Sequence, residues 1–330
     1  MDWAAILQNS LTQMVGVSAI IYCLAALGLN FQFGYAGLLN FGQAGFAAIG
    51  AYAVAVIVVS VNWPLWVAVI CGTIGAIIFA LILGIPTLRL RADYLAIVTI
   101  AAAEIIRQIA RSVTFNDVLG GSDGITGKYA AWWFDLNPIA QGLDTPILRF
   151  SRNDLWVVIT GWLLVALIVL FTWLLVRSPW GRVLKSIRED EDAVRSLGKN
   201  VYMYKMQALI IGGVIGSFAG VTFAVAAQSV QPDNYSTTLT FYAYVVLILG
   251  GAARVFGPVV GAMIFWFLLV FVSQVLNNAV KAGYISTDIL STDQIGQVQF
   301  MLVGLGLMLL MIFRPQGIFG DKKELALDER

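Results

Sequence analysis

From Trp3 to Leu88 the chain carries no aspartate, glutamate, lysine or arginine. A helix needs about 20 apolar residues to cross the hydrocarbon core of a bilayer, and a charge inside that core is costly. This uncharged stretch is too long for one crossing and too apolar for the core of a soluble domain. It predicts about three membrane spans joined by short connections, near residues 11–30, 35–61 and 64–86.

The composition of the whole chain agrees with a membrane protein. Hydrophobic residues make up 59% of the chain, charged residues make up 12%, and the mean hydropathy is +0.84. A soluble domain carries about 25% charged residues, so a soluble enzyme, a nucleic-acid-binding protein and a disordered protein are all poor matches. The net charge of +1 gives no general attraction to nucleic acid. The sequence contains no histidine, so histidine-based acid–base chemistry is excluded and no metal site is expected.

Six further apolar segments predict additional spans. All should be helices, because lipid offers no partner for an unpaired backbone group. The sequence therefore predicts an all-α, polytopic integral membrane protein with about nine helices, between eight and ten. Residues 1–330 form one transmembrane domain, with an external loop at about 112–153. The six segments lie near 93–111, 154–176, 206–230, 236–253, 256–278 and 295–313.

Lysine and arginine gather in loops that fall on one side of the predicted membrane. Loops rich in these residues are cytoplasmic by the positive-inside rule. The loop at 177–205 and the tail at 314–330 are therefore expected in the cytoplasm, and 112–153 and 231–235 outside. With about nine spans the N-terminus falls outside as well. The cationic residues of the loop and the tail are Arg177, Arg182, Lys185, Arg188, Arg195, Lys199, Lys205, Arg314, Lys322, Lys323 and Arg330.

The segment 177–205 is the least membrane-like part of the chain. The pattern from Arg182 to Leu197 predicts one short amphipathic helix, and Gly198 suits a left-handed cap at its C-terminal end. Composition leaves two interpretations open. The helix either docks onto a soluble partner or lies as a solvated helix at the membrane interface.

Glycine and amide side chains gather in a second segment. Small residues at spacings of three and four let membrane helices approach closely, and that interpretation covers most glycines of the chain. Uncharged polar side chains among glycines also occur where a broken helix lines a solute path. Both interpretations stay open for Gly37, Asn40, Gly42, Gln43 and Gly45.

A third candidate lies near the predicted outer end of the fourth span. Glu104, Arg107 and Arg111 share one helical face, so Glu104 and Arg107 are expected to form a structural ion pair. A proton relay is the alternative, since an ionisable group in a membrane helix is a functional hypothesis by default. Pairing and snorkelling at the membrane boundary favour the structural interpretation.

Several runs, taken in order, resemble the membrane permease subunits of bacterial ABC importers for branched-chain amino acids, of the LivM type. The resemblance extends over nearly the whole chain. Close relatives of that family import urea, short amides or other amino acids, so the resemblance is less specific for the solute. The runs are GYAGLLNFGQAGFAAIGAY (34–52), LRLRADYLAIVTIAAAEIIR (88–107), GGSDGITG (120–127), SPWGRVLKSIREDEDAVRSLGKNV (178–201), LILGGAARVFGPVVGAM (247–263) and FRPQGIFG (313–320).

The resemblance implies an importer in the bacterial plasma membrane. It consists of two permeases, expected to be different chains, two cytoplasmic ATPases and an extracytoplasmic solute-binding protein. The solute path would lie between the permeases, with lipid around them and no nucleic-acid partner. This chain has no Walker A motif, so it is expected to bind no cofactor, to be no enzyme, and to leave ATP to the partner ATPase.

In permeases of this kind a short helix between spans docks into a groove of the ATPase, and the resemblance assigns that role to residues 182–198. The solute is then expected to be a branched-chain or other hydrophobic amino acid, with urea or a short amide as the alternative. An ion-coupled secondary transporter is a weaker alternative. A membrane enzyme would need a convergent catalytic cluster, which the sequence lacks. The coupling residues would be Arg182, Lys185, Arg188, Glu189, Asp190, Glu191, Arg195, Leu197 and Gly198.

Overall fold

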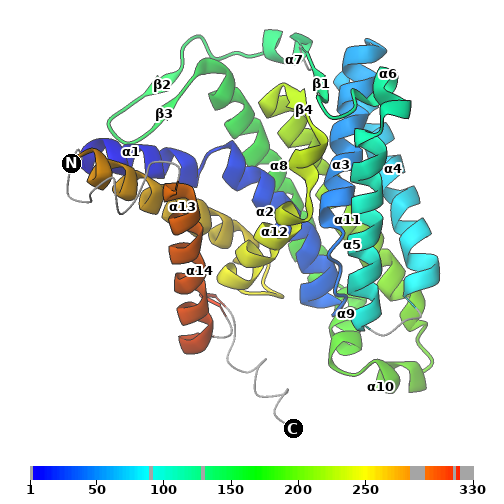
Figure 1. Cartoon of the computed structure of the whole chain (residues 1–330). Coiled ribbons are helices and arrows are strands. Elements are labelled where there is room, and N and C mark those ends of the chain that lie inside the picture. Colours follow the sequence, from blue (N-terminus) through cyan, green and yellow to red (C-terminus); the bar gives the residue numbers. More distant parts are fainter. Residues whose placement is uncertain (1–2, 89–91, 128–130, 283–293, 315–316, 320–330) are drawn as a thin grey trace.

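The computed structural model describes residues 3–88, 92–127, 131–282, 294–314 and 317–319. Within those residues, six helices are long and apolar enough to cross a membrane, and two shorter apolar helices accompany them. The prediction of a polytopic all-α membrane protein is therefore confirmed. Figure 1 shows a bundle of steep helices with small elements at each end.

The first half of the chain supplies five α-helices of 12 to 23 residues. Two of them end in π-helical turns, η1 and η2, which directly continue α2 and α3. Short elements then form the outer segment before α8. The bounds are α1 Trp3–Met14, α2 Val17–Leu29, η1 Asn30–Tyr35, α3 Gln43–Val54, η2 Ala55–Ser60, α4 Leu65–Thr87, α5 Ala92–Arg111, η3 Val113–Phe115, α6 Asn116–Leu119, β1 Ile125–Thr126, α7 Ala131–Asp135, β2 Leu143–Asp144 and β3 Arg149–Phe150.

The second half contains the two short helices α9 and α10 between long ones. The strand β4 pairs antiparallel with β1, and β2 pairs antiparallel with β3. The bounds are α8 Arg152–Arg177, α9 Pro179–Glu189, α10 Glu191–Ser196, α11 Val201–Ala227, β4 Ser229–Val230, η4 Pro232–Tyr235, α12 Thr237–Gly250, α13 Gly257–Lys281 and α14 Ile295–Phe313.

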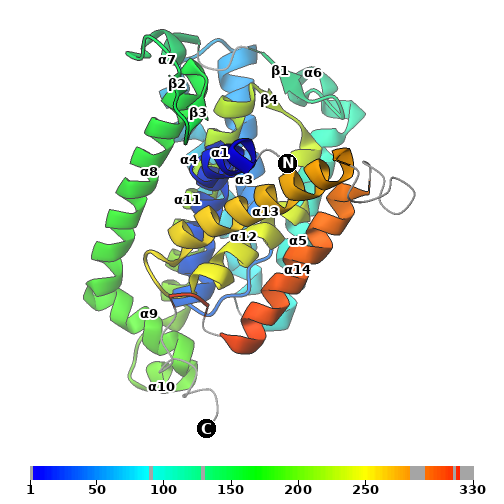
Figure 2. The same cartoon turned by 90° about the vertical axis from the view of Figure 1, so that its left-hand side faces the viewer.

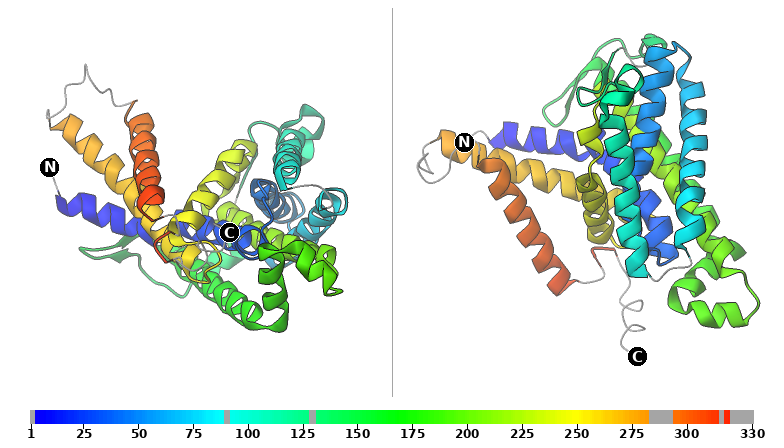
Figure 3. Two further views of the ribbon diagram at one scale, coloured as in Figure 1. Left: turned by 90° about the horizontal axis from the view of Figure 1, so that it is seen from below. Right: turned by 45° about the vertical axis from the view of Figure 1, so that its right-hand side comes forward.

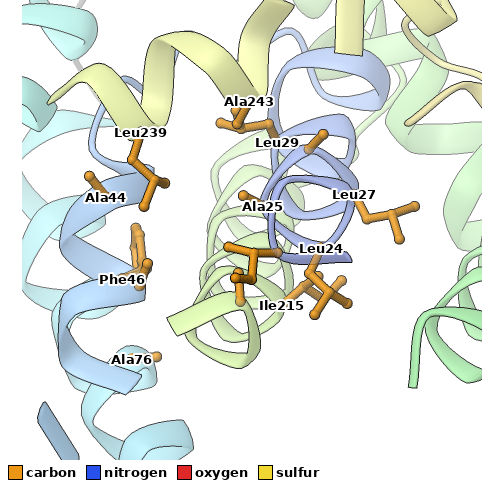
Figure 4. Close-up of a cluster of buried hydrophobic side chains, with 14 of the residues drawn as sticks. Leu24, Ala25, Leu27, Leu29, Ala44, Phe46, Ala76, Ile215, Leu239 and Ala243 are labelled. Carbon is orange, nitrogen blue, oxygen red and sulfur yellow. The ribbon is translucent and has the colours of Figure 1, made fainter. Parts of the chain in front are cut away.

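Helix α11 forms the centre of the bundle and packs against α2, α3 and α4. Glycines permit its closest crossing, with α3. A Cβ atom on Gly50 would overlap the carbonyl oxygen of Ser217, and one on Gly220 would overlap that of Ala47. Apolar side chains of α2, α3, α11 and α12 fill the space around this crossing, as Figure 4 shows. Close backbone contact and dense apolar packing replace the hydrophobic effect that is absent between helices in lipid.

Helices α1, α13 and α14 extend sideways from this bundle (Figure 3). Helix α1 packs along α13, and α13 packs against α14. Figure 2 shows α13 crossing the face of the molecule at a shallow angle, beside the steeper α8. The chain therefore has a compact bundle and a lateral extension.

The predicted spans agree with the helices except at two places. The predicted span at 35–61 is wrong at its start, because residues 36–42 are not helical and α3 begins only at Gln43. The predicted span at 236–253 corresponds to α12, which has only 14 residues. At 1.5 Å per residue, about 21 Å of helix is shorter than the hydrocarbon core of about 30 Å. In addition, α1 extends the first span toward the N-terminus and η1 extends it beyond residue 30, and α11 begins before residue 206.

The two ends of the bundle carry different elements. Helices α9 and α10 lie at one end, and β1, β2, β3, α6 and α7 lie at the other. We call these the inner and outer ends, following the prediction from loop charges. Helix α1 bonds to the outer segment, since Gln8 donates to the carbonyl of Thr145 at 2.7 Å. Of the tail at 314–330, only residues 314 and 317–319 lie within the described part.

Candidate functional site

The segment between α8 and α11 forms two helices where the sequence predicts one. The predicted single helix is wrong at Asp190, whose φ of −154° and ψ of 102° are extended. The Asp190 carboxylate accepts a hydrogen bond from the backbone N–H of Ala193 at 2.9 Å. Aspartate competes well for the N-cap position because it satisfies a free helical N–H group. Asp190 is therefore the cap that separates α9 from α10, and we call residues 179–198 the coupling segment.

The coupling segment is held by a small apolar core and by ion pairs. Ile187 and Val194 are buried together with Val201 of α11. Arg195 pairs with Glu191 at 2.7 Å, and Lys205 of α11 also pairs with Glu191. Ion pairs that share a partner orient the two short helices on the end of α11 more firmly than isolated surface pairs.

One face of the coupling segment is exposed. Leu197, at the tip of the coupling segment, is 79% exposed. Gly198 has a φ of +75°, as expected for the predicted left-handed cap. Arg182, Lys185 and Glu189 are exposed on α9. A large apolar side chain surrounded by charges on a protruding surface is typical of an interaction site.

The predicted path residues lie in and around a broken helix, residues 36–42, which we call the inner break. Asn40 is fully buried there. Its amide donates to Gln32 Oε1 at 2.7 Å, and its Oδ1 accepts from the N–H of Gly42 at 2.8 Å. The hydroxyl of Tyr244 donates to the Asn40 carbonyl at 2.9 Å. Asn40 thus satisfies backbone and side-chain groups of a non-helical segment, which hydrocarbon could not do.

Gln43 has a similar position at the first turn of α3. It is fully buried, and its amide donates to the carbonyls of Ala25 and Gly212 at 3.3 and 3.1 Å. Gly42 and Gly45 are buried too, whereas Gly37 is exposed at the inner end. In this conformation Asn40 and Gln43 line no open path. The role of these residues in solute passage stays a prediction.

The N-terminal ends of α3 and α12 meet inside the bundle. The backbone N–H of Ala44, in the first turn of α3, donates to Thr240 Oγ1 of α12 at 2.9 Å. Beside this contact the ring of Phe41 packs on that of Tyr244, with centroids 4.7 Å apart. Two helices that begin inside the protein are a feature of transporters, where the exposed helix ends and flexible connections face a solute. The sequence pattern does not indicate the α12 half of this junction.

A second break between α-helices, residues 228–236, precedes α12, and we call it the outer break. Its strand β4 pairs with β1 of the outer segment, with Val230 opposite Ile125. Asp233 of η4 accepts from Arg107 of α5 at 2.5 Å. Arg107 also pairs with Glu104 at 2.6 Å. The two residues expected to pair do so, whereas no local pattern in the sequence indicates Asp233 as the third member.

Asn30 fixes the inner end of α2 to the turn between α12 and α13. Its side chain donates to the carbonyl of Arg254 and accepts from the N–H of Ala253, both at 2.8 Å. Nearby, the N–H of Ile318 donates to the carbonyl of Leu249 at 3.0 Å, which attaches the start of the tail to the end of α12. Asn30 is a functional candidate that the sequence pattern does not reveal, because a single asparagine in an apolar run gives little signal.

Comparison with known proteins agrees with these features. Residues 11–312 match the family described as the permease component of the branched-chain amino acid transport system. The chain is 30% identical to the high-affinity branched-chain amino acid transport system permease protein LivM of Escherichia coli (strain K12), over 92% of this chain and 69% of the relative. It is 25% identical to a probable branched-chain amino acid transport permease protein LivM of Methanocaldococcus jannaschii, over 92% and 91% of the two chains.

A more distant relative carries a different name. The nucleoside ABC transporter permease protein NupC of Lactococcus lactis is 24% identical over 69% of this chain and 70% of its own length. The family match covers most of the chain, and the long apolar helices fit it. The chain is therefore a multi-pass protein of the bacterial inner membrane and belongs to the branched-chain amino acid ABC transport permease family.

Proposed function

We propose that the chain is one of two permease subunits in an ATP-driven importer of branched-chain or other hydrophobic amino acids. The observation that carries this proposal is the exposed coupling segment on a permease fold. The named relatives are transport permeases, and the second permease, two ATPases and an external solute-binding protein complete the assembly. Each partner contributes what this chain lacks, since the sequence has no nucleotide-binding motif.

The ATPase docks on the coupling segment. Leu197 supplies an exposed apolar contact at the tip, and Arg182, Lys185 and Glu189 supply charges around it. Glu191 has a different role, because its pairs with Arg195 and Lys205 hold the segment together. ATP acts by favouring one arrangement of the coupling segments over another through contact free energy.

The solute is neutral or zwitterionic and largely apolar. The polar groups of the inner break are uncharged amides, which suit a solute without net charge. The relatives with the longest matches carry branched-chain amino acids in their names. The nucleoside permease shows that the wider set of relatives differs in solute, so urea, a short amide and a nucleoside belong in the test as competing solutes.

The test is uptake of labelled leucine by the chain together with its partner permease, ATPases and binding protein. We expect uptake that requires ATP and this chain, with little uptake of urea or nucleoside. Uptake of urea alone would overturn the amino-acid assignment, and leucine uptake without any ATPase would overturn the importer assignment.

A double variant tests the docking surface without changing the rest of the permease. We expect E189K combined with Leu197→Asp to remove the ATPase from the purified complex and to abolish uptake, while the permease stays in the membrane. Charge reversal at both Glu189 and Glu191 should do the same, but it also breaks the pairs of Glu191 with Arg195 and Lys205. As a control, D117K reverses an exposed acid at the outer end and should leave the ATPase bound. Normal uptake by the double variant would contradict the docking assignment.

A further inference from the structure

The coupling segment contacts residues 34–37, at and just before the start of the inner break, and an arginine makes one of these contacts. Arg188 lies in the last turn of α9, and its guanidinium donates to the carbonyl of Gly34 at 2.7 Å. Gly34 belongs to η1, the π-helical turn that ends α2. The two residues are far apart in sequence, so this bond joins the exposed docking surface to the point where the chain leaves the membrane helix.

The bond has a clear physical reason. The last carbonyls of a helix have no N–H partner in the helix, and the helix dipole makes that end negative. A cation that donates to such a carbonyl forms a charge-assisted hydrogen bond, which is stronger than a neutral one. Arg188 therefore acts as a C-terminal cap for α2 that is supplied by another helix.

A second contact brings the same two elements together. Gly37 has a φ of +68°, and a Cβ atom placed there would lie 3.4 Å from Cγ of Arg188. Beside it the ammonium of Lys185 lies 5.8 Å from the centre of the Tyr35 ring, within reach of a cation–π attraction. Helix α9 thus rests along residues 34–37 rather than at one point.

The inner break continues from these contacts to the junction between the N-terminal ends of α3 and α12. Asn40 joins the break to Gln32 on one side and to Tyr244 of α12 on the other. Ala44 then bonds to Thr240 of α12. A displacement of residues 34–37 therefore reaches α12 through a few buried hydrogen bonds.

The packing around α9 leaves room for such a displacement. A cavity of about 390 Å³ lies between Lys185, Tyr35, Trp173 and the turn at Arg254. Close-packed interiors resist movement, whereas a cavity beside a helix lets that helix shift without forcing its neighbours aside. The described structure thus combines a direct bond with space for movement at the same place.

We propose that Arg188 is a positioning residue that transmits movement of the docked coupling segment to the inner break. This inference rests on the proposed function, because it requires an ATPase on α9. In the described conformation the Arg188 guanidinium holds the end of α2 in place. When α9 moves, Gly34 and Gly37 move with it, and the junction of α3 and α12 follows.

Two measurements test the inference, and one of them needs no ATPase. In the purified permease, we expect R188A to speed hydrogen–deuterium exchange of residues 36–42 about fivefold, because the cap of α2 is lost. K199A removes an exposed cation from the same loop and should leave this exchange unchanged. Unchanged exchange in R188A would overturn the proposed hold on the break.

In the complete importer, we expect R188A to keep the ATPase bound and to hydrolyse ATP within about twofold of the wild-type rate. Uptake should fall roughly tenfold, within the range of measured coupling energies. R188K, which keeps the charge but lacks the planar fork, should restore part of the uptake per ATP. Gly37→Ala should also reduce uptake per ATP. Alanine is strained at the φ of Gly37, and its methyl group would contact the Arg188 side chain.

Two results would overturn the inference while leaving the importer intact. One is unchanged uptake per ATP in R188A. The other is loss of the ATPase with a proportional fall in hydrolysis and uptake, which would make Arg188 a direct docking contact. Failure of the wild-type complex to show ATP-dependent uptake is a different result, which overturns the proposed function, and the exchange measurement still decides whether Arg188 holds the break.

Discussion

The inner and the outer breaks solve the same problem with different side chains. Each is a break between α-helices that leads into a helix beginning within the bundle. Four fully buried amide side chains bond the inner break and the helix ends beside it, and they belong to Asn30, Gln32, Asn40 and Gln43. The outer break is held by a short strand pair and by charged side chains. The type of side chain differs because water reaches the outer break, whereas the amides at the inner break are fully buried.

Amides suit the inner break because they donate and accept without carrying a charge. A buried charge would require a partner and would be costly even then, whereas a satisfied amide needs only hydrogen bonds. At the outer break, Asp233 is 64% exposed and Arg107 is 15% exposed. Water reduces the cost of charges there, and the ion pairs can be remade when the segment moves.

The comparison predicts that the inner break is far more sensitive to substitution. We expect Asn40→Leu to lower the free energy of unfolding by roughly 3 kcal/mol, because it leaves the Gly42 N–H and Gln32 Oε1 buried without partners. Unfolding by sodium dodecyl sulfate in mixed micelles measures this change. Asn9→Leu replaces an exposed amide of α1 and should change the free energy by under about 0.5 kcal/mol. Equal effects of the two substitutions would refute the structural role of Asn40.

Much of the fold could be predicted because hydrophobic length and loop charge are strong signals. Helices α4, α5, α8, α13 and α14 lie within a few residues of the predicted spans. The inner break was visible as glycines and amides in an apolar run, although periodicity alone still predicted a continuous span at 35–61. Its hydrogen bonds join residues that are far apart in sequence, and no local pattern encodes them.

The outer break and the cap at Asp190 show where sequence reasoning fails. The predicted span at 236–253 is apolar throughout, so only the structure reveals that α12 is too short to cross alone. Asp233 lies far from Arg107 in sequence, and their pairing depends on the fold. At Asp190 a run of acids is equally compatible with one helix or two, and the N-cap bond to Ala193 decides for two.

A smaller effect is expected at the outer break. R107A removes the pairs to Glu104 and Asp233, and we expect it to lower the free energy of unfolding by about 1 kcal/mol. In about 1 M salt this deficit should shrink, because exposed charges are screened, while the deficit of Asn40→Leu should persist. R149A removes an ion pair whose two side chains are both 72% exposed and should have almost no effect. A deficit in R107A that salt leaves unchanged would show that the outer cluster behaves as a buried network.

The smallest effect is expected at Glu104, and it decides between a structural pair and an ion-coupling site. Glu104 accepts from Arg107 at 2.6 Å and from Gln108 at 2.7 Å. Glu104→Gln keeps an acceptor oxygen, and Arg107 keeps its pair with Asp233. We therefore expect the variant to retain more than about half of the wild-type uptake, since exposed pairs contribute little. Leucine uptake into vesicles, with and without a proton gradient, measures this. Complete loss of uptake at normal membrane levels of the protein would mean that the Glu104 charge itself takes part in transport. The ion pairs of Glu104, Arg107 and Asp233 would then belong to the transport mechanism and would not only hold the outer break in place.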